Sequence, residues 1–142
     1  MDNLNPFSNS TEKRILYYGS FGSRYKELKR PPSGIIVSPI KYWIRNTYTD
    51  LNNNPPEGFM VSLYADIKNM YVDSLSTDYS DPFYDKDLTK MASVVAELQA
   101  KGFDSYLFDK PTESIVLFNT VSIINSGTGR LLWVIYSLIL YA

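Results

Sequence analysis

Glu113 is the carboxylate of this 142-residue chain whose surroundings raise the question of catalysis most directly. It ends the short polar segment 110–113 and directly precedes the apolar run 114–118, which contains several β-branched and aromatic residues. A run of this kind predicts a buried strand. Glu113 is therefore either a catalytic carboxylate presented at the start of that strand or a polar residue that ends a turn.

Any chemistry in this chain has to use carboxylates, tyrosines, hydroxyls, lysines or backbone groups, because the chain contains no histidine and no cysteine. The lack of histidine excludes a Ser-His triad and removes the commonest general base and metal ligand. The lack of cysteine excludes disulfides, zinc–thiolate sites and thiol nucleophiles. The sequence also contains no phosphate-binding loop, dinucleotide glycine fingerprint or metal-spaced acidic cluster, so we expect no metal site.

The net charge of −1 conceals an uneven distribution of charge along the chain. Residues 1–50 contain eight Lys and Arg against four Asp and Glu, whereas residues 51–142 contain six against eleven. A basic half can bind the phosphates of a nucleotide or of nucleic acid. The single local basic cluster, residues 24–30, is too short to indicate a nucleic-acid track by itself, and a solvated mixed surface is the simpler interpretation.

The two ends of the chain differ in character. The first 14 residues are polar and do not resemble a signal peptide, and we expect residues 1–12 to form a flexible leader. Residues 131–142 are almost entirely apolar but too few to span a bilayer, which takes about 20 residues in a helix. We expect this segment to dock in the core or on a partner, and residues 13–130 to form a single domain.

The clearest local pattern predicts a helix over residues 88–102. Asp87 can cap its start, and Gly102 stands where a glycine commonly follows a helix. Its apolar residues recur at helical spacing and form one stripe, made of Leu88, Met91, Val95 and Leu98. A second helix is predicted after residue 38, with Ser38 as the cap and Pro39 at the first helical position.

Strands are predicted at 14–21, 34–38, 59–67, 103–109 and 114–124. The Tyr-, Asp- and Ser-rich segment 69–87 is expected to be irregular, and a loop of that length in a small domain is usually functional or mobile. The order of strands and helices predicts an α+β domain with a largely antiparallel sheet.

Four pieces of the sequence, taken in order, carry a family resemblance. They are "LYYGS" (16–20), "GIIVSPIKYW" (34–43), "SLYADIKNMYV" (62–72) and "GFDSYLFDKPTESIVLFNTVSII" (102–124). Together they resemble the small ADP-ribosyltransferase-like domains of phage and mobile-element polyvalent proteins. The resemblance implies an ADP-ribosyltransferase-like fold of split antiparallel β-sheets with a few flanking helices, which binds NAD as a substrate in a cleft.

The resemblance also implies roles for individual residues. Glu113 would be the catalytic carboxylate, which stabilises the positive charge that develops on the ribose as nicotinamide leaves. The implied NAD-binding residues are Tyr18 at the adenosine ribose, Gly19 at the dinucleotide, Ser38 at the nicotinamide ribose, and Tyr42 or Tyr48 against the nicotinamide.

Two positions depart from the family pattern. Tyr18 stands where the family has a histidine or arginine. The family's glutamate lies four residues before a phenylalanine, a place that Ser114 holds relative to Phe118, so that Glu113 lies one residue further back. Within a strand such an offset turns a side chain to the opposite face, although a bulge or the end of a turn can restore its direction.

The resemblance predicts an NAD-dependent mono-ADP-ribosyltransferase-like protein, encoded by a phage and acting on a host macromolecule. The alternative is a catalytically inactive member of the same fold that serves as a phage structural or binding protein. A third hypothesis is an unrelated α+β binding domain that recognises its partner through residues 69–87. The first two place the protein in the cytoplasm of the host cell or in the virion, with NAD and a host or phage protein as partners.

Overall fold

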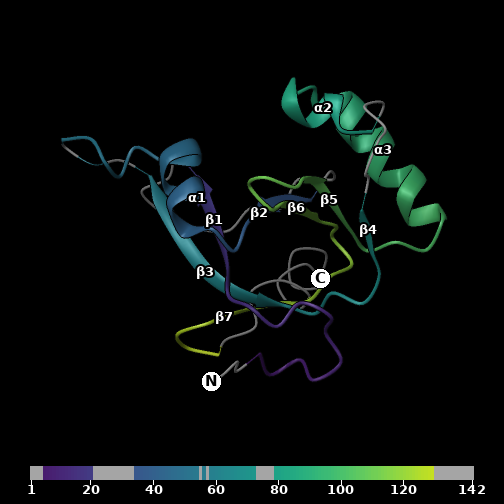
Figure 1. The fold of residues 1–142 in the computed structure, drawn as a ribbon, viewed down its shortest axis with the longest axis horizontal. Helices are drawn as coiled ribbons and strands as arrows, with labels where there is room; N and C mark the ends of the chain where they lie inside the picture. The colour runs from purple at the N-terminus through teal and green to yellow at the C-terminus, as the bar shows by residue number, and fades with distance from the viewer. Residues whose placement is uncertain (1–4, 21–33, 55, 57, 73–78, 130–142) are drawn as a thin grey trace, which may run out of the picture.

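The structure is a computed structural model and describes residues 5–20, 34–54, 56, 58–72 and 79–129. The described residues form seven strands and three helices (Figure 1). In chain order these are β1 (Leu16–Ser20), β2 (Ile35–Val37), α1 (Lys41–Tyr48), β3 (Phe59–Ala65), β4 (Met70–Val72), α2 (Asp81–Tyr84), α3 (Leu88–Ala100), β5 (Ser105–Asp109), β6 (Ser114–Leu117) and β7 (Ile123–Asn125).

The strands form two separate sheets. The first sheet has the order β1-β3-β7, and the second has the order β2-β6-β5-β4. All neighbouring strands are antiparallel except β4 and β5, which run parallel. The fold is therefore α+β with largely antiparallel sheets, as the sequence predicts.

The main core lies between the two sheets and explains why residues 115–118, in and directly after β6, are all apolar. Ile115 and Leu117 of β6 pack with residues of β1, β3 and β7 in one buried cluster. The alternate residues Val116 and Phe118 pack in a second buried cluster with α2, α3 and β5. Successive side chains of a strand point to opposite faces, so a strand covered on both faces needs apolar residues at every position.

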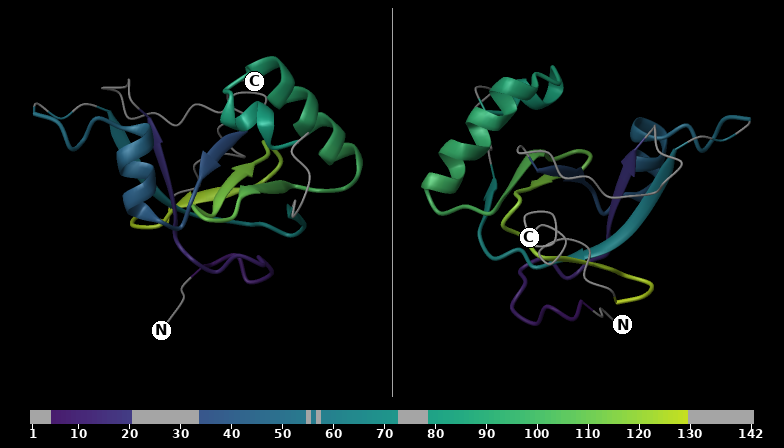
Figure 2. Two further views of the ribbon diagram at one scale, coloured as in Figure 1. Left: turned by 45° about the horizontal axis from the view of Figure 1, so that its top comes forward. Right: turned by 180° about the vertical axis from the view of Figure 1, so that it is seen from behind.

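Helices α2 and α3 cover the outer face of the second sheet, and α1 packs beside β1 on the first sheet (Figures 1 and 2). The predicted Asp87 cap is confirmed, since its carboxylate accepts the backbone N–H of Lys90, and Gly102 follows α3 with a φ of +93°. The prediction that Leu88 belongs to the apolar stripe is wrong, because Leu88 lies 68% exposed in the first turn of the helix. The buried residues of α3 are Met91, Val94, Val95 and Leu98.

Three other local predictions differ from the structure. Helix α1 begins at Lys41, and its N-cap residue is Ile40 rather than Ser38. The apolar stretch 114–124 is divided into β6 and β7, which lie in different sheets. The segment 69–87, expected to be irregular, contains β4 and α2.

The segment 5–12 of the expected flexible leader is hydrogen-bonded to the end of β3 and to the residues directly after it. The hydroxyl of Ser10, a residue only 2% exposed, donates to the carbonyl of Ala65 at 2.8 Å and accepts the N–H of Ile67 at 3.0 Å. The N–H of Thr11 donates to the carbonyl of Ile67 at 2.7 Å. The segment therefore forms part of the folded domain.

The basic cluster 24–30 and the apolar segment 131–142 lie outside the described residues. None of the helices in the described ranges combines the length and the apolar character that a membrane crossing requires.

Replacing Leu98 by alanine tests the position of α3. Leu98 is fully buried beneath the helix, so Leu98→Ala should lower the free energy of unfolding by about 2–5 kcal/mol in urea denaturation. Leu88→Ala on the same helix is the matched control and should cost less than about 0.5 kcal/mol, as exposed substitutions usually do. Equal losses for the two variants would contradict the placement of the helix.

Candidate functional site

Ser38 joins three elements at the place where the two sheets meet. Its backbone is bridged to Tyr17 of β1, with Tyr17 N–H donating to the Ser38 carbonyl at 2.8 Å and Ser38 N–H donating to the Tyr17 carbonyl at 3.1 Å. Its hydroxyl accepts the N–H of Ile40 at 2.9 Å and donates to the carbonyl of Thr112 at 2.7 Å. Ser38 is fully buried, so its hydroxyl serves mainly to hold the turn before β6 against the end of β2.

The turn that presents Glu113 is closed by hydrogen bonds of its own. The carboxylate of Asp109 accepts both the backbone N–H and the hydroxyl of Thr112, and Glu113 N–H donates to the Lys110 carbonyl at 3.1 Å. Burial opposes ionisation of Asp109, but the hydrogen bonds from Thr112 and Tyr84 outweigh it and lower the pKa of this carboxyl. The turn is thus held at both ends.

Glu113 itself has a left-handed backbone conformation, with a φ of +50°. A non-glycine residue rarely adopts this region, and such strain costs of order 1–3 kcal/mol. Glu113 is the last turn residue and not part of β6, so strand alternation does not determine the direction of its side chain. The register irregularity of this hairpin lies on the partner strand β5, between Leu107 and Asp109.

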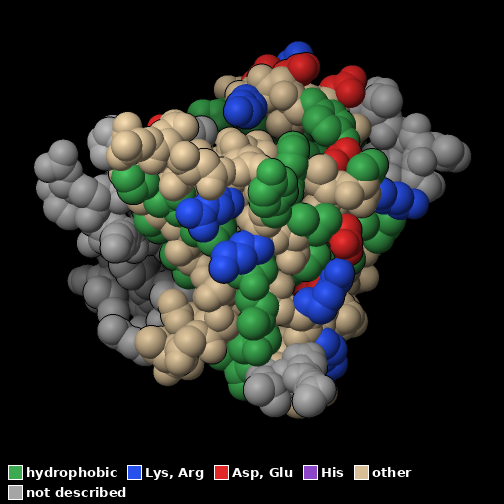
Figure 3. Space-filling view, turned by 60° about the vertical axis from the view of Figure 1, so that its left-hand side comes forward, with side chains coloured by type: hydrophobic (Ala, Val, Ile, Leu, Met, Phe, Trp, Pro, Cys, Tyr) green, Lys and Arg blue, Asp and Glu red, His purple; other side chains and the backbone are tan. Residues whose placement is uncertain are grey.

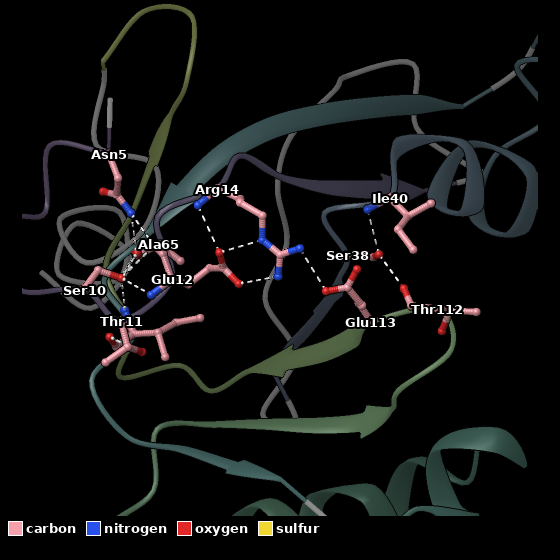
Figure 4. Close-up of polar contacts among 11 residues, drawn as sticks. Asn5, Ser10, Thr11, Glu12, Arg14, Ser38, Ile40, Ala65, Thr112 and Glu113 are labelled. Atoms are coloured by element: carbon pink, nitrogen blue, oxygen red, sulfur yellow. Dashed lines mark hydrogen bonds and ion pairs between the residues drawn. The ribbon is translucent and has the colours of Figure 1, made fainter. Parts of the chain in front are cut away.

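The carboxylate of Glu113 faces Arg14, which lies just before β1 (Figure 4). Its Oε1 is 2.9 Å from Arg14 Nη1. Arg14 is held from its other side by Glu12, through bonds of 3.0 Å from Nε to Oε2 and from Nη2 to Oε1. The hydrogen bond with Glu12 is the main cause that raises the pKa of Arg14 above its usual range, and Glu113 adds to the effect.

Ser114 occupies the place where the family pattern has its glutamate. It is 1% exposed, and its hydroxyl accepts a hydrogen bond from Trp43 Nε1 at 3.1 Å. The hydroxyl oxygen of Thr112 lies 2.7 Å from the hydroxyl oxygen of Ser114. The side chain at this position is therefore enclosed by α1 and the turn, whereas the Glu113 side chain remains 39% exposed.

A pocket of about 190 Å³ brings together three of the predicted NAD-binding residues, Tyr18, Gly19 and Tyr48. It also contains the backbone stretch 34–36 and the α3 residues Leu88 and Met91. Burial raises the pKa of both Tyr18 and Tyr48, with a further contribution from Asp109 at Tyr48. Both phenols are therefore protonated at neutral pH and can donate hydrogen bonds to a ligand.

The other predicted site residues do not line this pocket. Tyr42 lies on α1 with its side chain 74% exposed, so of the two candidate tyrosines only Tyr48 reaches the pocket. Glu113 belongs to the turn described above, and Ser38, which is hydrogen-bonded to that turn, adjoins β1 through its bridge with Tyr17. The predicted site thus consists of two neighbouring groups rather than one.

The fold requires a residue without a side chain at Gly19, whether or not a ligand binds there. A Cβ at this position would lie 2.8 Å from Thr49 Cγ2 and 3.0 Å from Ile44 Cγ2. These distances are shorter than normal carbon contacts, so the missing side chain allows α1 to pack closely against β1.

The positively charged side chains on the α1 side are spread among other residue types. Figure 3 shows Lys and Arg side chains on this face interspersed with hydrophobic and uncharged ones. Within the described ranges no group of three or more acidic side chains is arranged to hold a metal ion.

Sequence reasoning missed Glu12 and Arg14 as neighbours of Glu113, and Leu88 and Met91 as pocket residues. The local signal for the first pair was the placement of opposite charges at the start of a predicted strand. No local signal indicates that the first turn of α3 borders a pocket that also contains β1.

No protein-family model, curated protein or solved structure matches this chain.

Gly19→Ala tests the close approach of α1 to β1. The added methyl group should lower the free energy of unfolding by about 1–3 kcal/mol, as overpacking does. Thr49→Ser in the same chain removes the Cγ2 atom but keeps the hydroxyl that donates to the Arg45 carbonyl. The double variant should therefore recover at least about 0.5 kcal/mol, and strictly additive losses would argue against this contact.

The hydrogen bond between Tyr84 and Asp109 predicts a dependence of stability on alkaline pH. Burial and the neighbouring Asp109 carboxylate raise the pKa of Tyr84 from its ordinary 10.0 to about 12. The folded state thus retains a proton that the unfolded state has lost, and this stabilisation is present below pH 10 and disappears as the pH rises through 12. Urea midpoints measured over this window should fall less steeply for Tyr84→Phe than for the wild type. Tyr42→Phe, at an exposed site, should leave the slope unchanged.

Proposed function

We propose that this chain is an NAD-dependent mono-ADP-ribosyltransferase-like protein, encoded by a phage, with Glu113 as its catalytic carboxylate. The observation that carries the proposal is the juxtaposition of two features. Glu113 follows Thr112, whose carbonyl accepts the Ser38 hydroxyl, and the strand bridged to Ser38 leads into a pocket with Tyr18, Gly19 and Tyr48. The split pair of largely antiparallel sheets is also what the resemblance implies.

The proposed reaction breaks the bond between the nicotinamide nitrogen and the ribose. The electron pair of that bond leaves with nicotinamide, and a nucleophile of the acceptor forms the new bond to the ribose carbon and loses its proton. Positive charge develops on the ribose between these events, and a fixed carboxylate is most effective where that charge appears.

The ion pair with Arg14 engages one of the two Glu113 carboxylate oxygens, Oε1, and the side chain is 39% exposed. The second oxygen is the one we assign to a ribose hydroxyl. Arg14 and Glu12 would then hold the carboxylate in place, and the exposed part of the side chain leaves room for a substrate.

The same ion pair is the observation that favours the alternative, a catalytically inactive protein with a structural or binding role. A carboxylate already neutralised by an arginine has less charge to offer a developing cation. Tyr18, which stands where the family has a charged residue, adds no positive charge to the pocket. The two functions are distinguished by whether nicotinamide is released.

Glu113→Gln keeps the size of the side chain but removes its charge. If the proposal holds, transfer of label from NAD to protein in a host lysate should fall by about 100-fold or more, as it does when one preorganised stabilising group is lost. NAD affinity should change much less, because the interaction grows mainly as charge develops on the ribose.

Glu97→Gln is the matched control, since Glu97 lies on the surface of α3 and should leave transfer unchanged. NAD at 100 times its dissociation constant should also stabilise the wild type by about 2.7 kcal/mol in thermal denaturation. Stabilisation by NAD without release of nicotinamide would favour the inactive protein, and absence of both would refute NAD as the ligand.

A further inference from the structure

Strand β3 is paired only in part on each of its two sides. Strand β1 pairs with Phe59–Leu63, whereas β7 pairs only with Leu63–Ala65. One more bond, from Ser126 N–H to the Ser62 carbonyl at 3.0 Å, extends the β7 side by a single residue. Beyond it, the stretch 59–61 has no strand partner on that side among the described residues.

The register identifies which backbone groups point toward this open side. In an antiparallel ladder the residues that bond to a given neighbour alternate along the strand. Because the Ser62 carbonyl bonds on the β7 side, the N–H and carbonyl of Met60 point to the same side. Within the described residues neither group has a hydrogen-bond partner there, so this part of β3 can accept another strand.

A groove of about 450 Å³ lies along the same edge. It is lined by Leu51, the stretch 58–62 and Asn125. Its lining combines apolar side chains with polar groups and the backbone edge of β3, which suits an extended segment that offers both main-chain hydrogen bonds and apolar side chains.

The chain leaves the described region directly beside this groove. The side-chain oxygen Oδ1 of Asn125 accepts the N–H groups of Gly127 at 2.8 Å and Thr128 at 3.0 Å. The Asn125 carbonyl accepts the N–H of Gly129 at 2.9 Å. Residue 129 is therefore tied to a groove residue, and the following 13 residues, 130–142, start at its end.

The composition of that segment suits burial in the groove, because it is almost entirely apolar. Residues 131–142 read LLWVIYSLILYA and contain a single hydroxyl residue other than tyrosine. The β-branched and aromatic residues of this segment favour strands, and four residues in an extended conformation, which span about 13 Å, are enough to cover the open edge. An apolar segment of this length also needs cover from water.

We propose that residues from the segment 131–142 bind back onto their own chain as a short strand, antiparallel to β3 and alongside Gly58–Val61. The strand continues the line of β7 after the turn 126–129, and its apolar side chains fill the groove. The proposal concerns the C-terminal segment alone and holds whether or not the chain binds NAD.

Hydrogen exchange on the full-length protein tests the pairing at one backbone group. The Met60 amide should exchange at least about tenfold more slowly than an unprotected amide, because a paired strand must open before exchange occurs. Proline in place of Val134 and Ile135 removes two donors from the segment and should abolish that protection. Full exchange of Met60 at the unprotected rate in the wild type would overturn the proposal.

Disulfide trapping identifies the occupant, and the absence of native cysteine makes this experiment clean. Val61→Cys is combined with a second cysteine placed singly at each position from 131 to 136, because Cα atoms within about 4.4–6.8 Å can form a disulfide. A monomer with an internal disulfide at one or two of these positions is the expected result.

Val72→Cys on β4, an exposed residue at the edge of the second sheet, provides the matched control and should not cross-link with the same partners. Disulfide-linked dimers that increase with protein concentration would show that a second copy fills the groove, and would overturn the proposal. Equal cross-linking at Val72 and Val61, or none at Val61, would overturn it as well.

Discussion

The burial of β6 on both faces is the constraint on which the rest of the structure depends. Its side chains alternate between the core that joins the two sheets and the cluster beneath α2 and α3. A strand in that position needs hydrogen-bonded neighbours on both edges, which β2 and β5 supply. The packing is so close that a Cβ at Gly34 would lie 2.2 Å from the Leu117 carbonyl oxygen, and this position, with its φ of +85°, requires glycine.

The polar arrangement around Glu113 follows from that constraint. A strand held on every side cannot adjust, so the turn that leads into it has to be fixed by its own bonds, and Asp109, Ser38 and Trp43 provide them. Glu113 has a strained, left-handed backbone conformation at the end of this turn. Strained residues recur at functional sites, where the surrounding structure determines their conformation.

The ion pair between Arg14 and Glu113 couples this turn to the start of β1. Exposed ion pairs contribute little to stability. Arg14, however, also forms a bidentate pair with Glu12, whose side chain is nearly buried. The N-terminal segment that carries Glu12 is in turn anchored through Ser10. Residues that would otherwise resemble a loose leader thus help to set the position of a charge in the candidate site.

Local features of the fold could be predicted where the physical cause is local. The cap, the spacing of apolar residues and the terminal glycine of α3 lie within one stretch of sequence, and they predict the helix well. The exposure of Leu88 could not be predicted, because spacing alone does not reveal where the sheet beneath a helix ends. The stretch 114–124 likewise reads as one strand, since an apolar run carries no sign that its two halves enter different sheets.

The sequence by itself determined which chemistry is available: without histidine or cysteine, only carboxylates, hydroxyls, amines and phenols remain. It also determined the α+β class, because strand and helix patterns depend on neighbours along the chain. Only the tertiary structure decided that Glu113 meets Arg14, and that Tyr48 but not Tyr42 of the same helix enters the pocket. Contacts between distant residues depend on how whole elements pack, and no local pattern records that.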